Sequence, residues 1–118
     1  MRAVVLVILV TTFLSVSAEE AQWQFEGWAG PSFPVRMFAP DGANAETNII
    51  IVMHGASRDA RRYYKDWTAL AEELELIIVV PEFTQQRFRK SARYNLGHVF
   101  DPDTGQQRAE ALSTFSAI

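Results

Sequence analysis

The chain has 118 residues, with 11 Lys and Arg against 14 Asp and Glu, which gives a formal net charge of −3. Hydrophobic residues make up 48% and charged residues 21%, which is typical of one small globular domain and excludes a disordered segment. The absence of cysteine excludes disulfides, thiolate metal ligands and a cysteine nucleophile. The acidic balance argues against a protein that binds nucleic acid or an anionic membrane.

The first 18 residues have the layout of a secretory signal peptide. Arg2 supplies a positive charge, residues 3–16 are almost wholly apolar, and Val16-Ser17-Ala18 ends the stretch with small residues. A membrane anchor is the alternative, but the apolar stretch is shorter than the roughly 20 residues that a spanning helix needs. We therefore expect cleavage after Ala18, a mature domain of residues 19–118, a secreted or periplasmic location, and no membrane association after cleavage.

An antiparallel hairpin is expected at the start of the mature domain. Residues 22–26 alternate between polar and apolar side chains, and residues 35–39 form a second short strand candidate. Residues 27–34 are rich in Gly and Pro and predict a turn. Pro40-Asp41-Gly42 predicts another turn, because Pro presets φ and Gly accepts positive φ.

A strand–helix–strand unit is expected next. Residues 48–53 and 76–80 are continuous, largely β-branched runs, which is typical of strands buried on both faces of a helix-covered parallel sheet. Apolar residues between the two runs recur at helical spacing, and Ser57 or Asp59 can cap the helix. Parallel strands need a connection of a dozen or more residues, so the pattern predicts a right-handed crossover. The helical stripe consists of Tyr63, Trp67, Leu70, Ala71 and Leu74.

The sequence pattern indicates secondary structure less clearly after Pro81. Residues 82–103 show no period, and long irregular connections in compact domains are usually functional. A helix is expected from about Gln106, with Leu112, Phe115 and Ile118 as its buried side. The predicted α/β sheet would keep an open apolar edge and only one complete covering helix. We expect the amino-terminal part of a larger α/β protein; the alternative is a complete small α+β domain that pairs with a partner.

One short motif carries possible chemistry. His54-Gly55-Ala56 follows the first β-branched strand, at the sheet edge where open α/β folds place their ligand sites. Gly55 lets the backbone approach a substrate closely, and the N–H of Ala56 is expected to be free for a developing oxyanion. The helix start beyond it adds a partial positive field. His54 by itself is more often a structural histidine than a catalyst.

The order of these features resembles the start of an α/β-hydrolase, in particular the secreted esterases similar to polyhydroxyalkanoate depolymerases. The matching residues are Ile49 to Ala56, the amphipathic helix with Tyr63-Tyr64 and Trp67, and the strand that ends in Val79-Val80-Pro81-Glu82. The resemblance covers residues from about 22 to 83 well and the rest loosely.

The resemblance implies the amino-terminal part of an α/β-hydrolase sheet, with a hairpin followed by a parallel β-α-β unit. It implies that the backbone N–H of Ala56 is one donor of an oxyanion hole, and that His54 and Gly55 shape its turn. The implied substrate is a small or polymeric carboxylic ester, and no cofactor or metal is implied. The oligomeric state stays open.

The nucleophile of that family is missing from the chain. Family members carry a serine in G-x-S-x-G, followed by an acid and a histidine. His98 precedes any possible nucleophile and is expected to be a loop histidine. The full protein is therefore expected to hydrolyse esters, whereas this chain alone is expected to be inactive. The serines of the mature region, none of which has the G-x-S-x-G context, are Ser32, Ser57, Ser91, Ser113 and Ser116.

Other candidate sites are weaker. The carboxylates of Asp59, Glu82, Asp101 and Asp103 lack metal-ligand spacing with the two histidines, and solvated loop carboxylates are commoner. Four cations within residues 87–93 could grip an anionic substrate or partner, although a solvated loop is the commoner case. The scattered glycines form no phosphate loop.

The alternative function is a non-catalytic exported domain that binds a partner through aromatic side chains, of which the candidates are Trp23, Trp28, Tyr63, Tyr64 and Tyr94. The hydrolase interpretation has two structural requirements that separate it from this alternative. The N–H of Ala56 must have no partner inside the domain, and residues 49–53 must not lie at a solvent-facing border of the sheet.

Overall fold

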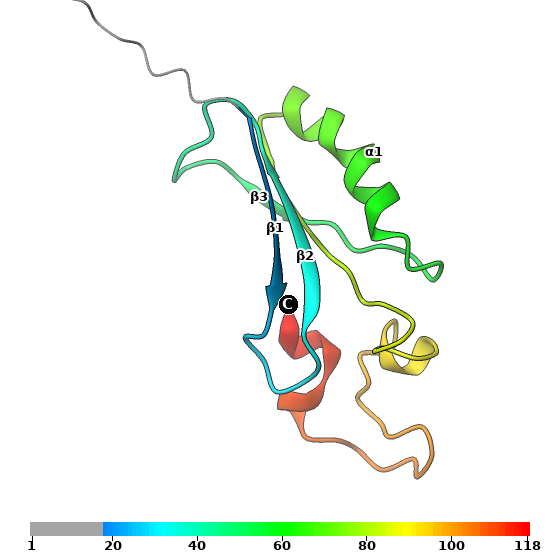
Figure 1. The fold of residues 1–118 in the computed structure, drawn as a ribbon. Helices are drawn as coiled ribbons and strands as arrows, with labels where there is room; N and C mark the ends of the chain where they lie inside the picture. The colour runs from blue at the N-terminus through cyan, green and yellow to red at the C-terminus, as the bar shows by residue number, and fades with distance from the viewer. Residues whose placement is uncertain (1–17) are drawn as a thin grey trace, which may run out of the picture.

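A computed structural model describes residues 18–118, which form a mixed four-stranded sheet with the strand order β1-β2-β4-β3 and one α-helix (Figure 1). The predicted signal peptide falls on residues 1–18, of which residues 1–17 lie outside the described part, so it stays a prediction. Within residues 18–118, no helix has both the length and the apolar character needed to cross a membrane.

The predicted hairpin is confirmed. Strand β1 (Glu19–Phe25) pairs antiparallel with β2 (Phe33–Ala39), and the register places Trp23 opposite Val35. The turn after β2 also forms, since the N–H of Ala43 donates to the carbonyl of Pro40 at 3.1 Å. Gly42 has a φ of 78°, which an L-residue with a side chain adopts only with strain.

The predicted parallel crossover is confirmed as well. Strand β3 (Ile49–Ile51) and strand β4 (Ile77–Pro81) are parallel neighbours joined through helix α1 (Ala60–Glu73). Asp59, not Ser57, caps the helix, because its carboxylate accepts the N–H of Arg62 at 3.0 Å.

Strand β4 lies between β2 and β3, and it carries the most buried side chains of the sheet. Ile78 and Val80 point to the α1 face and are inaccessible to solvent. Because β4 ends at Pro81, the chain leaves the sheet there and enters the irregular segment that closes over the opposite face.

Residues 48–53 were expected to form a strand that is buried on both faces of the sheet, and this expectation is wrong within the described chain. Strand β3 lies at the border of the sheet, and Ile49 and Ile51 are 63% and 45% exposed. Only Ile50 and Val52 pack beneath the helix. A β-branched run predicts an extended strand, but the pairing partners of β4 decide its place: antiparallel β2 occupies one side of β4 and leaves β3 with a single neighbour.

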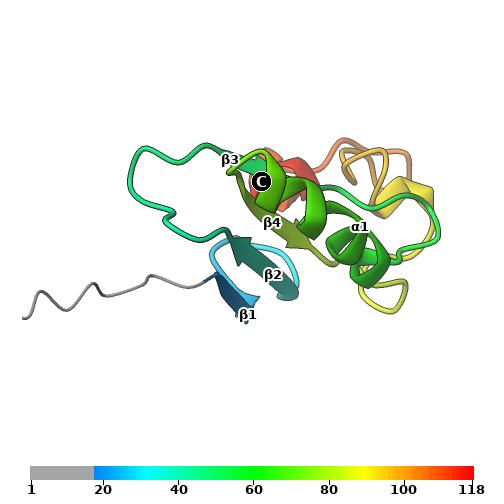
Figure 2. The same ribbon diagram turned by 90° about the horizontal axis from the view of Figure 1, so that it is seen from above.

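The core has two halves, one on each face of the sheet. Helix α1 covers β2 and β4 on one face, while β1 lies away from it, as Figure 2 shows from above. Leu70 and Leu74 of the predicted helical stripe stay exposed. The buried residues under α1 are Phe38, Val52, Ala60, Ala71, Ile78 and Val80. The buried residues of the opposite face are Phe33, Val35, Phe83, Phe88 and Tyr94.

The predicted helix from Gln106 does not form. Residues 110–112 and 114–117 form two short 3₁₀ helices, η2 (Glu110–Leu112) and η3 (Thr114–Ala117). The predicted buried stripe is exposed, and Ser113 and Thr114 are buried in its place. Ser113 Oγ donates to the carbonyl of Gly97 at 3.0 Å, and Thr114 Oγ1 donates to that of Arg93 at 3.0 Å. These side-chain bonds to the backbone compete with a continuous helix. The exposed stripe is Leu112, Phe115 and Ile118.

Residues 82–103 are irregular, as expected. Their only helical piece in the described chain is the short 3₁₀ helix η1 (Ser91–Arg93). The segment is nevertheless anchored, because Phe83, Phe88 and Tyr94 fill the core opposite α1. This packing places an irregular backbone directly beside the end of β3.

Candidate active site

The turn after β3 contains the predicted motif. The N–H of Arg58 donates to the carbonyl of Gly55 at 3.0 Å, which closes a β-turn with Ala56 and Ser57 exposed in its middle. A Cβ added at Gly55 would lie 3.1 Å from the hydroxyl of Tyr63. A side chain at position 55 would therefore displace the Tyr63 hydroxyl of α1 by a few tenths of an ångström, and glycine avoids that shift.

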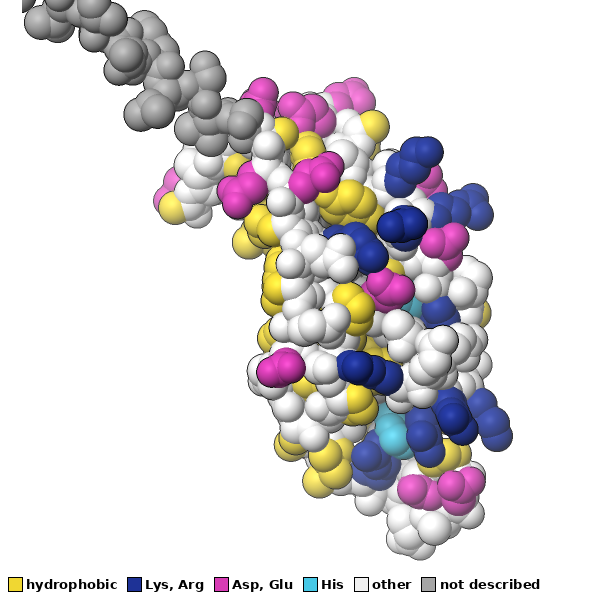
Figure 3. Space-filling model, in the orientation of Figure 1, with side chains coloured by type: hydrophobic (Ala, Val, Ile, Leu, Met, Phe, Trp, Pro, Cys, Tyr) yellow, Lys and Arg dark blue, Asp and Glu magenta, His cyan; other side chains and the backbone are white. Residues whose placement is uncertain are grey.

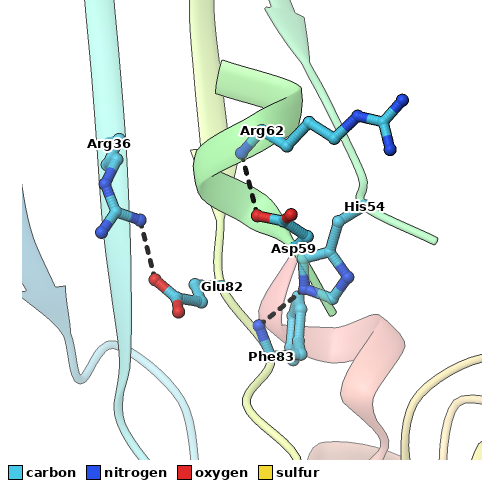
Figure 4. A network of polar contacts seen from close by, with 6 residues as sticks. All are labelled: Arg36, His54, Asp59, Arg62, Glu82 and Phe83. Atoms are coloured by element: carbon cyan, nitrogen blue, oxygen red, sulfur yellow. Dashed lines mark hydrogen bonds and ion pairs between the residues drawn. The ribbon is translucent and has the colours of Figure 1, made fainter. Parts of the chain in front are cut away.

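His54 anchors this turn from inside the domain. Its side chain is 3% exposed, and its Nε2 accepts the N–H of Phe83 at 3.0 Å (Figure 4). Because Nε2 accepts, the ring proton is assigned to Nδ1, which lies 3.0 Å from the carbonyl of Gly55 and donates to it. Both ring nitrogens are therefore engaged within the domain.

The protonation state of His54 follows from its surroundings. Burial is the largest influence and lowers the pKa of His54 below its ordinary value of 6.5, while its bond to Gly55 acts in the opposite direction. The cation of Arg58 lowers the pKa further. The neutral ring is thus the form that fits the site, and the ring has no free nitrogen for proton transfer.

Arg58 is a central residue of the site that the sequence did not reveal. Its side chain is buried, with 8% of the residue exposed. The guanidinium donates to three backbone carbonyls, those of Phe83 at 2.7 Å, Phe88 at 2.9 Å and Lys90 at 3.1 Å. Its own backbone is left-handed, with a φ of 62°. Arg58 therefore fixes the irregular segment against the turn.

Tyr94 completes the attachment. The guanidinium of Arg58 lies 4.3 Å from the centre of the Tyr94 ring, in a cation–π arrangement. The hydroxyl of Tyr94 donates to the carbonyl of His54, and the two rings lie 4.6 Å apart. Burial raises the pKa of Tyr94, which keeps the hydroxyl protonated as a donor. The turn is thus held in place by the side chains of His54, Arg58 and Tyr94.

Ala56 has a distinct hydrogen-bonding state. Within residues 18–118, no acceptor takes a hydrogen bond from its N–H, and the residue is exposed. The turn lies beyond the carboxyl end of β3, where parallel strands of open sheets present their ligand sites. The carboxylate of Asp59 at the start of α1 offsets part of the helix field that the sequence led us to expect at Ala56.

The other predicted candidates are spread over separate structures. Glu82 forms an ion pair with Arg36 at 2.7 Å, as Figure 4 shows, and Asp59 caps α1. Asp101 accepts two backbone N–H groups of the turn that follows it. Among residues 18–118, no group of three or more metal-ligating side chains could hold an ion.

His98 lies outside this site. It occupies the irregular segment, with a φ of 52°, and its Nε2 is buried without a hydrogen-bond partner in the described chain. It lines a pocket together with Arg87, Arg93 and Arg108. The turn after β3 therefore contains His54, Gly55 and Ala56, whereas the second histidine lines a pocket elsewhere in the domain.

The depressed pKa of His54 predicts a loss of stability in acid. Below pH 6.5 the unfolded chain binds a proton at this residue more readily than the folded chain, so stability falls as the pH drops through this range. His54→Gln keeps an acceptor for the Phe83 N–H and removes the titration, at a cost of about 1 kcal/mol at neutral pH. Urea midpoints at pH 7.5 and 5.0 should differ less in the variant than in the wild type. An unchanged difference would show that His54 does not titrate in this way. Burial lowers the pKa of His98 as well, so His98→Gln measures the part of the difference that belongs to the other histidine.

Comparison with known proteins supports the fold. No family model and no curated protein matches the chain. Among solved structures, poly(aspartic acid) hydrolase-1 from Sphingomonas sp. KT-1 matches at a TM-score of 0.79 and 35% identity, over 89% of this chain and 39% of that protein. A poly(3-hydroxybutyrate) depolymerase from Bordetella parapertussis matches in fold at a TM-score of 0.75 and 23% identity, over 83% of this chain and 34% of its own.

The border position of β3 therefore does not contradict a hydrolase fold. Our requirement that this strand lie inside the sheet is not met within the described chain, and the fold assignment rests instead on the match to the two solved structures. The chain spans less than two fifths of the length of each of these proteins. It has the fold of part of an α/β-hydrolase, similar to the corresponding part of these two depolymerising hydrolases.

Proposed function

We propose that the chain forms part of a serine-type hydrolase of carboxylic esters and supplies one donor of its oxyanion hole. The observation that carries the proposal is the Gly55–Arg58 turn, whose middle residue Ala56 is exposed and donates its N–H to nothing within residues 18–118. A fixed N–H at this edge of the sheet stabilises negative charge on a substrate oxygen more effectively than water does, because it needs no reorganisation.

The proposed reaction assigns each residue a step. A serine hydroxyl attacks the ester carbonyl carbon and passes its proton to a histidine base, and the carbonyl oxygen becomes an oxyanion. The N–H of Ala56 donates to that oxygen until the C–O bond to the alcohol breaks, and the histidine gives its proton to the leaving alcohol oxygen. Water then releases the acid from the serine by the same steps. The proposal assigns the serine, the acid and the base to the remainder of the protein; no serine of this chain has the G-x-S-x-G context that supports the nucleophile assignment.

His54 and Gly55 act as positioning residues in this proposal. The His54 ring cannot accept a substrate proton while both nitrogens are engaged, but it fixes the carbonyl of Gly55 and the backbone of Phe83. Gly55 leaves room for the Tyr63 hydroxyl beneath the turn. Their contribution is therefore the orientation of the Ala56 N–H.

A polymeric substrate is the class that the comparisons favour. The two solved proteins are named for the hydrolysis of poly(aspartic acid) and of poly(3-hydroxybutyrate), both of which are polymers. Residues 1–18 have the charged start, apolar stretch and small-residue end of a signal peptide, so we propose that they direct export and that the protein acts in the periplasm or outside the cell.

Hydrolysis of p-nitrophenyl butyrate tests the proposal. The protein to assay is the chain joined to the coding sequence that continues its reading frame, which we call the extended protein. It should contain G-x-S-x-G within a few tens of residues, hydrolyse the ester, and lose activity when that serine becomes alanine. The 118-residue chain alone should be inactive. A stop codon directly after Ile118, with a soluble and cooperatively folded product, would instead favour the non-catalytic binding domain.

A further inference from the structure

A pocket lies away from the Gly55–Arg58 turn, in the irregular half of the domain. Its volume is about 300 Å³, and it is lined by the segment after β1, by residues of the 87–98 region and by residues of the 101–112 region. The Trp28 indole forms part of its wall. That ring is fixed, because its N–H donates to the carbonyl of Pro31 at 2.9 Å and the ring stacks on Phe88.

The lining of this pocket is strongly cationic although the chain is acidic overall. It includes Arg87, Arg93 and Arg108 against the single carboxylate of Asp101. Lys and Arg side chains gather beside a histidine on the face that Figure 3 shows. The ion pairs found within residues 18–118 are Arg36–Glu82 and Arg62–Asp66, so none of the three arginines is neutralised in this way.

The arginines keep donors available for a ligand. Arg87 uses one nitrogen on the carbonyl and hydroxyl of Ser32, and Arg108 makes a single 3.4 Å contact with the carbonyl of His98. The guanidinium of Arg93 donates to no residue of the described chain. Since a guanidinium carries five N–H donors, most of the donors in this pocket have no protein acceptor among residues 18–118.

His98 adds an unsatisfied group to the same lining. Its Nε2 is buried and lacks a partner in the described chain, which is costly for a polar atom unless a ligand or water completes the bond. Its backbone is held in place, because its N–H donates to the carbonyl of Ala92 at 2.8 Å. Asp101 forms no ion pair with these arginines within residues 18–118; its Oδ1 accepts the N–H groups of Asp103 and Thr104, and its charge offsets part of that of Arg108.

We propose that this pocket binds a carboxylate group of an anionic ligand, through Arg93, Arg108 and His98, with Trp28 as an apolar wall. Guanidinium groups match the planar fork of a carboxylate and bind it in bidentate fashion. A phosphate offers similar oxygens. The carboxylate is favoured because ester hydrolysis, the proposed function on which this choice rests, releases one, and an anionic polymer carries many.

Isothermal titration calorimetry of the 118-residue chain tests the pocket without requiring catalysis. The probes are a tetra-aspartate peptide blocked at both ends, the matching tetra-asparagine peptide and inorganic phosphate. Tetra-aspartate should bind, tetra-asparagine should not, and phosphate should bind more weakly than tetra-aspartate. Arg93→Gln and Arg108→Gln should each weaken tetra-aspartate binding on the order of tenfold, which is the scale of one charge-assisted hydrogen bond.

Arg89→Gln is the matched control, because Arg89 is exposed in the same segment and does not line the pocket. It should change the affinity by less than about twofold. If Arg89→Gln weakened tetra-aspartate binding equally, the effect would reflect the overall positive charge of the segment and not the pocket. If phosphate bound more tightly than tetra-aspartate, the pocket would be a phosphate site. Either result overturns the proposal. Binding is measured separately from hydrolysis. A failure to bind tetra-aspartate therefore does not change the conclusion of the ester assay, and an inactive extended protein does not change the conclusion of the binding experiment.

Discussion

Replacing Arg58 with Met is expected to lower the free energy of unfolding by about 3 kcal/mol. Met retains much of the apolar stem but removes the donors that satisfy the carbonyls of Phe83, Phe88 and Lys90. Buried acceptors that lose a charged donor cost more than exposed ones, and this side chain is almost fully enclosed. Urea denaturation followed by circular dichroism measures the change.

Two further variants test whether the loss of stability depends on the buried guanidinium. Arg61→Met removes an exposed arginine of α1 and should change stability by less than about 0.5 kcal/mol. Arg58→Lys keeps the positive charge but cannot reach three carbonyls with a planar fork, so its stability should fall between those of Arg58→Met and the wild type. Equal stability of Arg58→Met and Arg61→Met would contradict the role that we assign to the buried guanidinium.

Replacing Ala56 with Pro in the extended protein is expected to lower kcat for p-nitrophenyl butyrate by about 10²–10³-fold. Proline removes the one N–H that we assign to the oxyanion, and that N–H satisfies no acceptor within residues 18–118, so folding should survive. The effect should appear mainly in kcat and not in KM, because the bond strengthens as charge develops on the oxygen.

Ala56→Gly is the matched control for that substitution. It preserves the N–H and removes only an exposed methyl group, so its kcat should stay within a few-fold of the wild type. Circular dichroism and urea midpoints of both variants should remain close to those of the wild type. A proline variant that folds and retains full activity would eliminate Ala56 as a donor.

The regular elements could be predicted because their signals are local. Alternation in residues 22–26, the turn chemistry of Pro40-Asp41-Gly42 and the cap at Asp59 each depend on neighbours within a few positions, and the structure confirms all three elements. The two β-branched runs also predicted a parallel crossover, since the helical period between them is clear.

The wrong predictions concern features that depend on contacts between distant residues, which the periodicity of hydrophobic residues does not reveal. The strand at residues 49–51 has the composition of an interior strand, but its place follows from β2 occupying the other side of β4. Near the end of the chain, the spacing of Leu112, Phe115 and Ile118 suggested a helix. Hydrogen bonds from Ser113 and Thr114 to carbonyls about 16 to 21 residues earlier replace it with short 3₁₀ turns.

The candidate site was only half visible in the sequence. His54-Gly55-Ala56 is a contiguous motif after a strand, so the sequence located it. The role of Arg58 was not predictable, because it reaches carbonyls 25 to 32 residues away. Tyr94 was expected only as an aromatic contact for a partner, whereas it is buried and its hydroxyl reaches the carbonyl of His54 across 40 residues. Arg58 stands between two candidate helix caps and carries no pattern that distinguishes it from a solvated arginine.

A crystal structure of the extended protein inactivated by a p-nitrophenyl alkylphosphonate tests the central claim most directly. The phosphonate attaches to the nucleophilic serine and places one oxygen where the oxyanion of an ester would develop. We predict that this oxygen lies about 2.7–3.1 Å from the backbone nitrogen of Ala56. An adduct whose oxygen points away from the Gly55–Arg58 turn, or an Ala56 N–H that donates to a protein acceptor in that structure, would contradict the account.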